Sequence, residues 1–321
     1  MRRLRVGCVG TGFIAGKHLT ALAGFEDVEI VAVADTDETR ATAAAATYDA
    51  RAHTDGVRLI ETEDLDALWL CVPPFAHGPL EEAAVRRGLP FLVEKPLAHD
   101  LATAERIAGL IEDAGLLTAV GYHWRHLDLV EQVRELVVER PPLVLTGHWL
   151  DAAPPVAWWS RRSSSGGQLV EQATHLFDLA RLLVGEVEGF ATTRVGVDAP
   201  DDVPVASVTA LRFASGAVGS VTASRVLPAR HHVGVQLVGE GYAVELRERA
   251  IVDHELTVTT AAGTVTKRSP QDPIAAEDRA FLDAVAGRGE AVRSSYAEAL
   301  RSHALAWSAE QPPAGGDETD D

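Results

Sequence analysis

Residues 6–15 read VGCVGTGFIA, and this stretch decides the fold of the chain. Its first four residues form an apolar run that is too short for a helix, which indicates a buried strand. The glycines that follow end this strand and open a helical pattern, the context that a dinucleotide-binding G-x-G-x-x-G/A turn requires. Gly10 permits the tight turn, Gly12 lets the backbone approach a pyrophosphate, and Ala15 is small enough for close packing of helix on strand. The turn residues predicted to contact the nucleotide are Gly10, Thr11, Gly12, Phe13 and Ile14.

An acidic residue lies where the adenine ribose would be bound. Asp35 ends the predicted strand 28–34 and falls at the interval expected for a carboxylate that accepts hydrogen bonds from this ribose. Such a carboxylate repels a 2′-phosphate, so we expect NAD rather than NADP, and Arg40 is the nearest residue that argues the other way. The alternative is an ordinary turn with an aspartate cap on the next helix.

Short apolar runs alternate with helical patterns through the first third of the chain. The predicted strands are 6–9, 28–34, 67–72, 90–93 and 117–120, and the predicted helices are 15–23, 38–47, 80–87 and 102–113. Continuously apolar strands are typical of parallel sheets that helices cover on both faces. The pattern predicts an α/β fold whose N-terminal domain, residues 1–121, is a Rossmann domain with a doubly wound parallel sheet.

The pattern changes after residue 121. β-branched runs broken by Gly, Pro and Asp fill residues 190–265, which is typical of antiparallel strands. The other elements predicted here are helices at 126–138, 169–184, 274–286 and 296–309 and a strand at 143–150. We therefore expect a C-terminal α+β domain, residues 122–310, with a largely antiparallel open sheet. Residues 311–321 are Pro, Gly and acidic residues and are predicted to be a disordered tail.

Composition excludes several classes of partner. The net charge of −18 disfavours nucleic acid and anionic membrane surfaces. Cys8 and Cys71 both lie in apolar runs, so neither a disulfide framework nor a cysteine-rich zinc site is expected, and a reducing compartment fits best. No segment approaches the roughly 20 apolar residues that cross a bilayer, and glycines interrupt the stretch after the basic N-terminus. We expect a soluble, cytoplasmic protein.

Three further motifs accompany the glycine turn. CVPPFAH, residues 71–77, and VEKPL, residues 93–97, each follow a predicted strand, and GGQLVEQATHLFD, residues 166–178, lies in the second domain. Together with the turn, these motifs resemble the glucose-fructose oxidoreductase, inositol dehydrogenase and MocA (Gfo/Idh/MocA) family over almost the whole chain. The resemblance implies a two-domain NAD(P)-dependent oxidoreductase that acts on sugars, cyclitols or related polyols.

The third motif departs from the family pattern at three positions. Glu171 stands where Asp is commoner, Ala173 where Gly is commoner, and Ser165 where the first glycine of a triplet is usual. These departures are compatible with the activity and leave the substrate open.

The proposed chemistry needs a proton acceptor and a cation. Hydride transfer from a secondary alcohol requires one group to take the hydroxyl proton and another to stabilise the developing alkoxide. Lys95 follows a parallel strand, where ligands bind in such folds, and we expect it to orient the substrate hydroxyl. The resemblance places His175 in the active site as the general base, and Glu171 would hold and polarise its imidazole. Glu171, His175 and Asp178 are spaced to share one face of the predicted helix, and a surface lysine and a solvated helix face are the alternatives.

Other residues are predicted to line the site. The predicted cofactor contacts beyond the turn are Asp35, Pro73, His77, Glu94 and Lys95, and a capping or structural role is the alternative for His77. The predicted substrate contacts are Lys95, His123, Arg125, Trp158 and His175. Aromatic rings can stack on sugar rings and arginine can bind carboxylate or phosphate, although ordinary packing explains such residues equally well. The sequence leaves open whether the Lys95–Pro96 bond is cis.

The same residues also bear on three rival functions. A zinc alcohol dehydrogenase is disfavoured because His123, His126 and His148 lack the cysteine partners and spacing of such a site, so no metal is predicted. Two rivals share the fold: an NAD-dependent glycoside hydrolase, and a non-catalytic regulator that binds NAD and a sugar.

The predicted strand 203–213 suggests an assembly. One of its faces carries Pro204, Ala206, Val208 and Ala210, and no charge appears before Arg212. Helices 169–184 and 274–286 can cover one face of the sheet, but no segment remains for the other. We therefore predict a homodimer or homotetramer through the C-terminal sheet, and the family resemblance implies the same.

Overall fold

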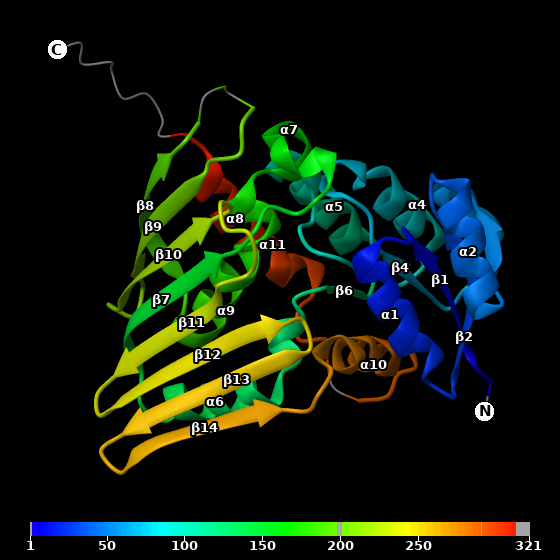
Figure 1. Cartoon of the computed structure of the whole chain (residues 1–321). Coiled ribbons are helices and arrows are strands. Elements are labelled where there is room, and N and C mark those ends of the chain that lie inside the picture. Colours follow the sequence, from blue (N-terminus) through cyan, green and yellow to red (C-terminus); the bar gives the residue numbers. More distant parts are fainter. Residues whose placement is uncertain (1, 198, 200, 290, 313–321) are drawn as a thin grey trace. The chain divides into compact units, whose positions relative to one another are not determined.

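The computed structural model of the chain describes residues 2–197, 199, 201–289 and 291–312. The chain divides into two compact units, the first comprising residues 1–132 and 269–301 and the second residues 133–268 and 302–321 (Figure 1). The predicted domains are continuous in sequence, whereas residues 269–301 belong to the first unit. Most of the predicted tail, 313–321, lies outside the described residues. Among the described residues, no helix has both the length and the apolar character that a membrane span requires.

The first unit contains a six-stranded sheet in the order β3-β2-β1-β4-β5-β6. The strands are β1 (Leu4–Val9), β2 (Val28–Ala34), β3 (Arg51–His53), β4 (Ala67–Leu70), β5 (Phe91–Val93) and β6 (Thr118–Val120). All five neighbouring pairs are parallel. The order reverses between β1 and β4, where ligands bind in doubly wound sheets. The predicted Rossmann architecture is therefore confirmed, although β3 was not foreseen because it is short and largely exposed.

Helices connect these strands. They are α1 (Phe13–Ala23), α2 (Glu38–Tyr48), α3 (Gly56–Thr62), α4 (Pro79–Arg87) and α5 (Leu101–Ala114). Successive side chains of β1 enter different apolar cores, since Val9 belongs to one cluster and Cys8 to another. This double burial explains why the strands are continuously apolar in sequence.

The predicted packing of the helix at 274–286 is wrong. Helix α10 (Pro273–Val285) was expected to cover the C-terminal sheet, but it packs against α1 in the first unit. The ring of Phe281 meets that of Trp69 edge-on, with centroids 5.4 Å apart. The apolar face of α10 thus completes the core behind β4.

The second unit contains an eight-stranded sheet in the order β14-β13-β12-β11-β7-β10-β9-β8 (Figure 1). The strands are β7 (Pro142–Leu150), β8 (Val187–Val195), β9 (Ala206–Phe213), β10 (Val218–Ser224), β11 (His232–Gly239), β12 (Tyr242–Ala250), β13 (Asp253–Thr260) and β14 (Gly263–Ser269). Strands β7 and β10 pair in parallel, whereas β7–β11, β11–β12, β12–β13, β10–β9 and β9–β8 pair antiparallel. The predicted, largely antiparallel sheet is confirmed.

The predicted helix 169–184 is two helices, α8 (Gln168–Glu171) and α9 (Thr174–Val184). The amides of Gln172 and Ala173 both donate to the carbonyl oxygen of Gln168, at 3.0 Å, so the chain makes a wider turn before α9 begins. Glu171 is therefore not on a continuous helix with His175, and the expected single polar face is wrong.

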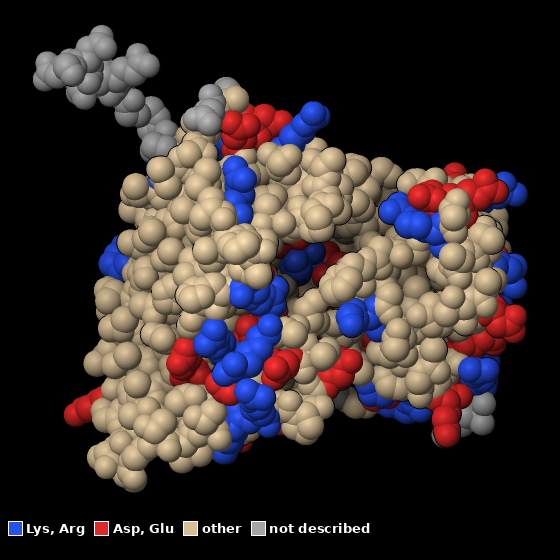
Figure 2. Space-filling model, in the orientation of Figure 1, with Lys and Arg blue, Asp and Glu red and all other residues tan. Residues whose placement is uncertain are grey.

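One face of the second sheet is packed and the other is open. Helix α9 packs on β7 and α8 on β10. In β9, Ser207, Thr209, Leu211 and Phe213 are buried, whereas Val208, Ala210 and Arg212 are exposed. Register places Val144, Val208, Val218 and Val238 on this open side, and each is at least 36 % exposed. Figure 2 shows few charged side chains on the visible surface over these strands.

Six further helical elements complete the part of the chain that the structure describes. Three of them, α6 (Asp128–Glu139), α7 (Arg162–Ser165) and α11 (Tyr296–Glu310), are α-helices. Three single turns, η1 (Pro74–Ala76), η2 (His123–His126) and η3 (Ala157–Ser160), are 3-10 helices that carry several of the predicted site residues.

Candidate active site

The glycine turn after β1 has the geometry of a nucleotide cradle. Gly10 has φ +91°, and a Cβ at this position would lie 2.1 Å from the carbonyl oxygen of Cys71. A Cβ at Gly12 would have no neighbour within 4 Å. Gly12 is also the N-cap of α1 and offers no side chain there. The turn is therefore open on the side of the helix N-terminus, where a pyrophosphate would be bound.

The carboxylate of Asp35 is already ordered by donors from its surroundings. Its Oδ2 accepts from the Thr11 backbone nitrogen at 3.0 Å and from Thr11 Oγ1 at 2.8 Å, and its Oδ1 accepts from Arg40 Nη2 at 2.8 Å. Burial opposes ionisation of Asp35, but the amide of Asp37 and the donors from Thr11 and Arg40 outweigh it and lower the pKa. The residues present fit a dinucleotide. Its ribose hydroxyls would have to share the Asp35 carboxylate with these donors or displace them.

The residues expected near the nicotinamide have internal partners. His77 is buried, and its Nδ1 lies 2.6 Å from Glu81 Oε1, while Glu81 Oε2 accepts from the Gly78 amide at 2.6 Å. This arrangement caps α4, which agrees with the structural role given as the alternative for His77, while its predicted contact with the cofactor stays a prediction. Its Nε2 is buried without a hydrogen-bond partner among the described residues. Pro73 precedes η1, and Phe13 at the start of α1 is 74 % exposed.

A buried histidine holds the strand end that carries Lys95. His18 of α1 is fully buried, with Nε2 3.0 Å from Glu94 Oε1 and Nδ1 2.7 Å from Asp278 Oδ1. Glu94 Oε2 accepts from the backbone nitrogen of Lys95 at 3.0 Å. Trp69 Nε1 donates to Asp278 Oδ1 at 2.8 Å. The Lys95–Pro96 peptide bond is cis.

Electrostatics make this cluster an ion pair network. Burial by itself disfavours a charged His18, but Asp278 and Glu94 together raise its pKa well above the ordinary value. Burial likewise opposes charge on Glu94, yet His18 lowers the pKa of this carboxyl. His18, Glu94 and Glu277 offer ligand atoms within 4.8 Å of one another. Both ring nitrogens of His18 already face carboxylate oxygens, those of Glu94 and Asp278, so a metal ion bound to His18 would have to displace one of these contacts.

In the second unit, His175 is held by an aromatic ring. It is the second residue of α9 and is 3 % exposed. The indole of Trp149 stacks on its imidazole, with centroids 5.8 Å apart and planes 10° from parallel. The guanidinium of Arg230 lies 5.8 Å from the Trp149 ring centroid, and Arg230 Nε donates to Asp151 Oδ2 at 2.8 Å. The plane of the imidazole is thus fixed by packing.

The two acidic residues near His175 in sequence have different partners. Trp159 Nε1 donates to Glu171 Oε2 at 2.6 Å. Asp178 Oδ1 accepts from Ser302 Oγ at 2.8 Å, and Arg181 Nη1 donates to the same hydroxyl at 2.6 Å. Asp178 therefore joins α9 to α11, whereas Glu171 joins α8 to the tryptophan-rich loop.

The predicted substrate contacts differ in accessibility. Arg125 is buried, and its guanidinium donates to the carbonyl oxygen of Arg293 at 2.9 Å and to Glu298 Oε1 at 3.1 Å. His123 is buried beside Trp124, whereas Trp158 is partly exposed in η3. The internal contacts of Arg125 are those of a structural residue, since a ligand carboxylate would have to displace them.

Each of the two regions matches a separate model of the same protein family. Residues 4–122 match an oxidoreductase family with an NAD-binding Rossmann fold, and residues 141–245 match the GFO/IDH/MocA C-terminal domain. The chain belongs to the Gfo/Idh/MocA family. The predicted resemblance is confirmed.

Relatives of this family member include dehydrogenases of cyclitols and sugars. It is 32% identical over 230 residues to inositol 2-dehydrogenase 4 of Saccharopolyspora erythraea, covering 68% of this chain and 66% of that protein. It is 29% identical over 262 residues to myo-inositol 2-dehydrogenase of Thermotoga maritima, covering 78% of each chain. Levoglucosan dehydrogenase of Pseudarthrobacter phenanthrenivorans is 28% identical over 311 residues, covering 84% of this chain and 79% of that protein.

Solved structures share its fold. Levoglucosan dehydrogenase in complex with NADH and levoglucosan has a TM-score of 0.85 at 22% identity, and the match covers 96% of each chain. The WlbA dehydrogenase of Bordetella pertussis in complex with NADH and UDP-GlcNAcA has a TM-score of 0.82 at 24% identity, covering 95% of this chain and 94% of that one.

Sequence reasoning missed several residues that shape these regions. His18 and Asp278 were not singled out, although a histidine within the apolar pattern of α1 is an unusual residue to bury. The contact of Trp149 with His175 has no signal in the sequence because three other elements, η3, α7 and α8, lie between β7 and α9. Asp278 lies 260 residues after His18, so only the fold brings the pair together.

Proposed function

We propose that this family member transfers a hydride between NAD(H) and a secondary hydroxyl or keto group of a sugar, cyclitol or related polyol. The observation that carries the proposal is the anchored EKP segment: Lys95 follows β5 of a nucleotide-binding sheet, and Glu94, His18 and Asp278 fix its backbone. The names of the relatives at 28–32% identity support the substrate class.

Each side chain has a role suited to its chemistry. The nicotinamide, when bound, accepts or supplies the hydride. Lys95 would orient the substrate hydroxyl and favour its alkoxide, and His175 would take the hydroxyl proton as general base. Glu171 would hold the imidazole of His175. The indole N–H of Trp159 donates to the Glu171 carboxylate and fixes its position. The Trp149 ring would keep the imidazole from rotating.

A substrate panel tests the proposal. Inositols, aldoses, sugar acids and their keto forms would be offered with NAD or NADH, and turnover would be followed by nicotinamide absorbance. We expect at least one cyclitol or sugar to be oxidised. No signal across the panel, from protein that binds NADH, would favour the non-catalytic regulator. Release of an aglycone without net NADH would instead identify the glycoside hydrolase.

For the cofactor, we infer a preference for NAD over NADP. The support is the ionised carboxylate of Asp35, which accepts from hydroxyl groups and repels a 2′-phosphate. Arg40 lies beside it with its side chain 57% exposed and partly neutralises this carboxylate. Titration of each cofactor against the protein measures the preference, and tighter binding of NADP would contradict it.

For the assembly, we infer a homodimer or homotetramer through the open face of the second sheet. The exposed valines Val144, Val208, Val218 and Val238 form an apolar surface there, and burial of such surface drives association. Light scattering at micromolar concentration tests the inference. We expect a dimer or tetramer that Val208→Asp dissociates, and a monomeric wild-type protein would contradict it. The cytoplasmic location stays a prediction.

A further inference from the structure

Helix α8 begins at a residue that cannot cap it. Its N-cap is Gly167, which has no side chain to accept hydrogen bonds from the first amides of the helix. The missing acceptor comes from the far end of α11. Glu310 Oε2 accepts from the backbone nitrogen of Leu169 at 2.9 Å, across 141 residues of sequence. Glu310 thus takes the place of the side chain that usually caps a helix from its own N-cap position.

Gly167 and Glu310 fit together closely. A Cβ at Gly167 would lie 2.3 Å from Glu310 Cδ, and φ at this residue is +99°. A side chain at position 167 would therefore be strained by the backbone and would also collide with the carboxylate. The absent side chain at the N-cap makes room for the cap that Glu310 supplies.

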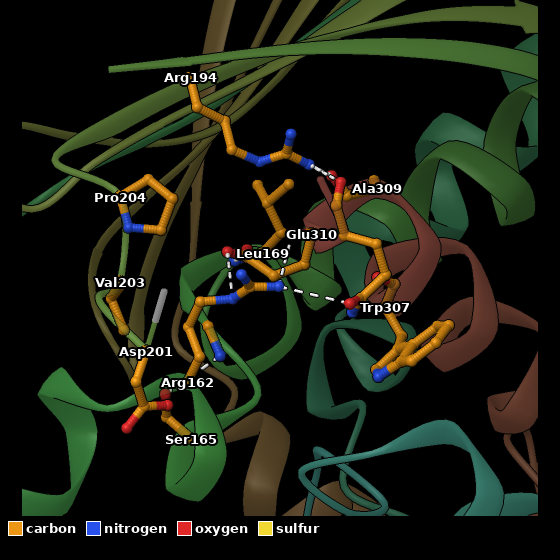
Figure 3. Close-up of polar contacts among 12 residues, drawn as sticks. Arg162, Ser165, Leu169, Arg194, Asp201, Val203, Pro204, Trp307, Ala309 and Glu310 are labelled. Atoms are coloured by element: carbon orange, nitrogen blue, oxygen red, sulfur yellow. Dashed lines mark hydrogen bonds and ion pairs between the residues drawn. The ribbon is translucent and has the colours of Figure 1, made fainter. Parts of the chain in front are cut away.

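Two arginines hold Glu310 in place. Arg162 Nη2 donates to the carbonyl oxygen of Glu310 at 3.1 Å, and its Nε lies 3.9 Å from Glu310 Oε1. Arg194 donates to the carbonyl oxygens of Ala309 and Gln311. Figure 3 shows the two guanidinium groups reaching the end of α11 from different elements. Cations at a helix C-terminus are favoured, so this end of α11 is fixed by charge as well as by packing.

The carboxyl group is suited to this role in either protonation state. Burial raises the pKa of Glu310 to about 7, against the lowering effects of the Leu169 amide, Arg162 and Arg194. A neutral carboxyl group still has an oxygen that can accept from Leu169. The cap therefore requires an acceptor at this point rather than a full charge.

We propose that Glu310 is a positioning residue of the active site: by capping α8 it fixes the segment that carries Glu171 and leads into His175. The inference rests on the proposed function. Helix α8 is one turn long, so few of its amides are satisfied within it, and loss of the cap would let Glu171 and the start of α9 shift. Glu310 lies far from the reacting groups in sequence and acts only through this segment.

Two substitutions at Glu310 differ in whether they keep a hydrogen-bond acceptor for α8. Glu310→Gln keeps an oxygen for the Leu169 amide, whereas Glu310→Ala removes it. We expect Glu310→Ala to lower kcat by about 10-fold to 100-fold, as small displacements of reacting groups do, with NAD affinity unchanged. Glu310→Gln should retain most of the wild-type kcat. Equal losses in the two variants, or wild-type kcat in Glu310→Ala, would overturn the proposal.

Amide exchange gives a readout that does not depend on turnover. Exchange at Leu169 should accelerate at least tenfold in Glu310→Ala and remain near wild type in Glu310→Gln, and unchanged exchange in Glu310→Ala would overturn the cap itself. If the wild-type protein turns over no substrate, the proposed function fails on its own, while the exchange experiment still reports on the cap.

A glycine pair provides a matched control. Gly167→Ala and Gly185→Ala both place alanine at positive φ, but a Cβ at Gly185 meets nothing within 4 Å. We expect Gly167→Ala to reduce kcat more than Gly185→Ala, and the added Glu310→Ala substitution to leave Gly167→Ala no worse. A full, additive loss in the double variant would contradict the close fit of Gly167 and Glu310.

Discussion

Replacing His18 by leucine is the most direct test of the network beneath Lys95. Leucine has a similar volume and no polar atom, so Glu94 and Asp278 would lose the cation that lies 3.0 Å and 2.7 Å from their oxygens. Both carboxylates would stay buried, at 5% and 0% side-chain exposure. The variant therefore isolates the electrostatic role of the imidazolium from its packing.

The expected cost is large. Removing one partner of a buried ion pair typically costs about 3–5 kcal/mol, because the remaining charge is desolvated and unpaired. A domain is commonly stable by about 5–15 kcal/mol, so the variant would fold with a reduced margin. His53→Leu is the matched control: His53 contacts Glu63 at 2.8 Å, but this carboxylate keeps a second partner, Arg51, whose side chain is 58% exposed. Its loss should cost at most about 1 kcal/mol.

The pH dependence has a definite sign. The pKa of His18 is raised in the fold, so its stabilisation is complete below the unfolded value of about 6.5 and is lost only as pH rises through the folded pKa. In the leucine variant the pKa values of Glu94 and Asp278 would rise, so its stability would fall as pH increases from the ordinary carboxyl range. The wild type keeps the full His18 contribution up to about pH 6.5, so the difference between wild type and variant should be greater at about pH 6.5 than at about pH 4.5.

Urea unfolding at the two pH values measures both effects. The same preparation would be assayed for turnover and NAD binding, since loss of the Glu94 anchor should lower kcat more than cofactor affinity. The reasoning is refuted if His18→Leu loses no more stability than His53→Leu, or if its deficit is greatest at the lower pH.

Three further predictions follow from the site. Lys95→Ala and His175→Ala should each lower kcat by about 100-fold to 10,000-fold with NAD affinity retained, as measured by nicotinamide absorbance and titration, and full activity in either variant would remove that residue from the mechanism. Asp35→Asn should reduce the ratio of NAD to NADP affinity, and an unchanged ratio would show that the carboxylate does not set it. Gly10→Ala should abolish NAD binding, because the added Cβ would lie 2.1 Å from a carbonyl oxygen. Gly88→Ala is the control, since Gly88 has φ +61° and open space around it. This control should lose only about 1–2 kcal/mol of unfolding free energy and should still bind NAD.

Local patterns were sufficient for the larger features of the fold. Continuous apolar strands, glycine turns and helical periodicity predicted the doubly wound sheet, the largely antiparallel second sheet and the family. The same reasoning failed for the predicted helix 169–184. The hydrophobic periodicity continues across residues 172 and 173, but a wider hydrogen-bonded turn interrupts the helix there. It also failed for α10, whose apolar face could have matched either sheet and whose choice depends on Asp278 and Phe281 meeting His18 and Trp69.

The sequence by itself determined which residue types follow which strands: Gly10 and Gly12 after β1, Asp35 after β2, and Lys95 after β5. These relations are local, since a strand end and the residues that follow it are neighbours along the chain. Only the tertiary structure decided which buried polar groups share a partner. His18 joins Glu94 to Asp278, Trp149 stacks on His175, and Glu310 caps α8. Such pairs satisfy buried charges and backbone amides across long stretches of chain, and no periodicity or spacing encodes them because their geometry exists only once the elements have packed.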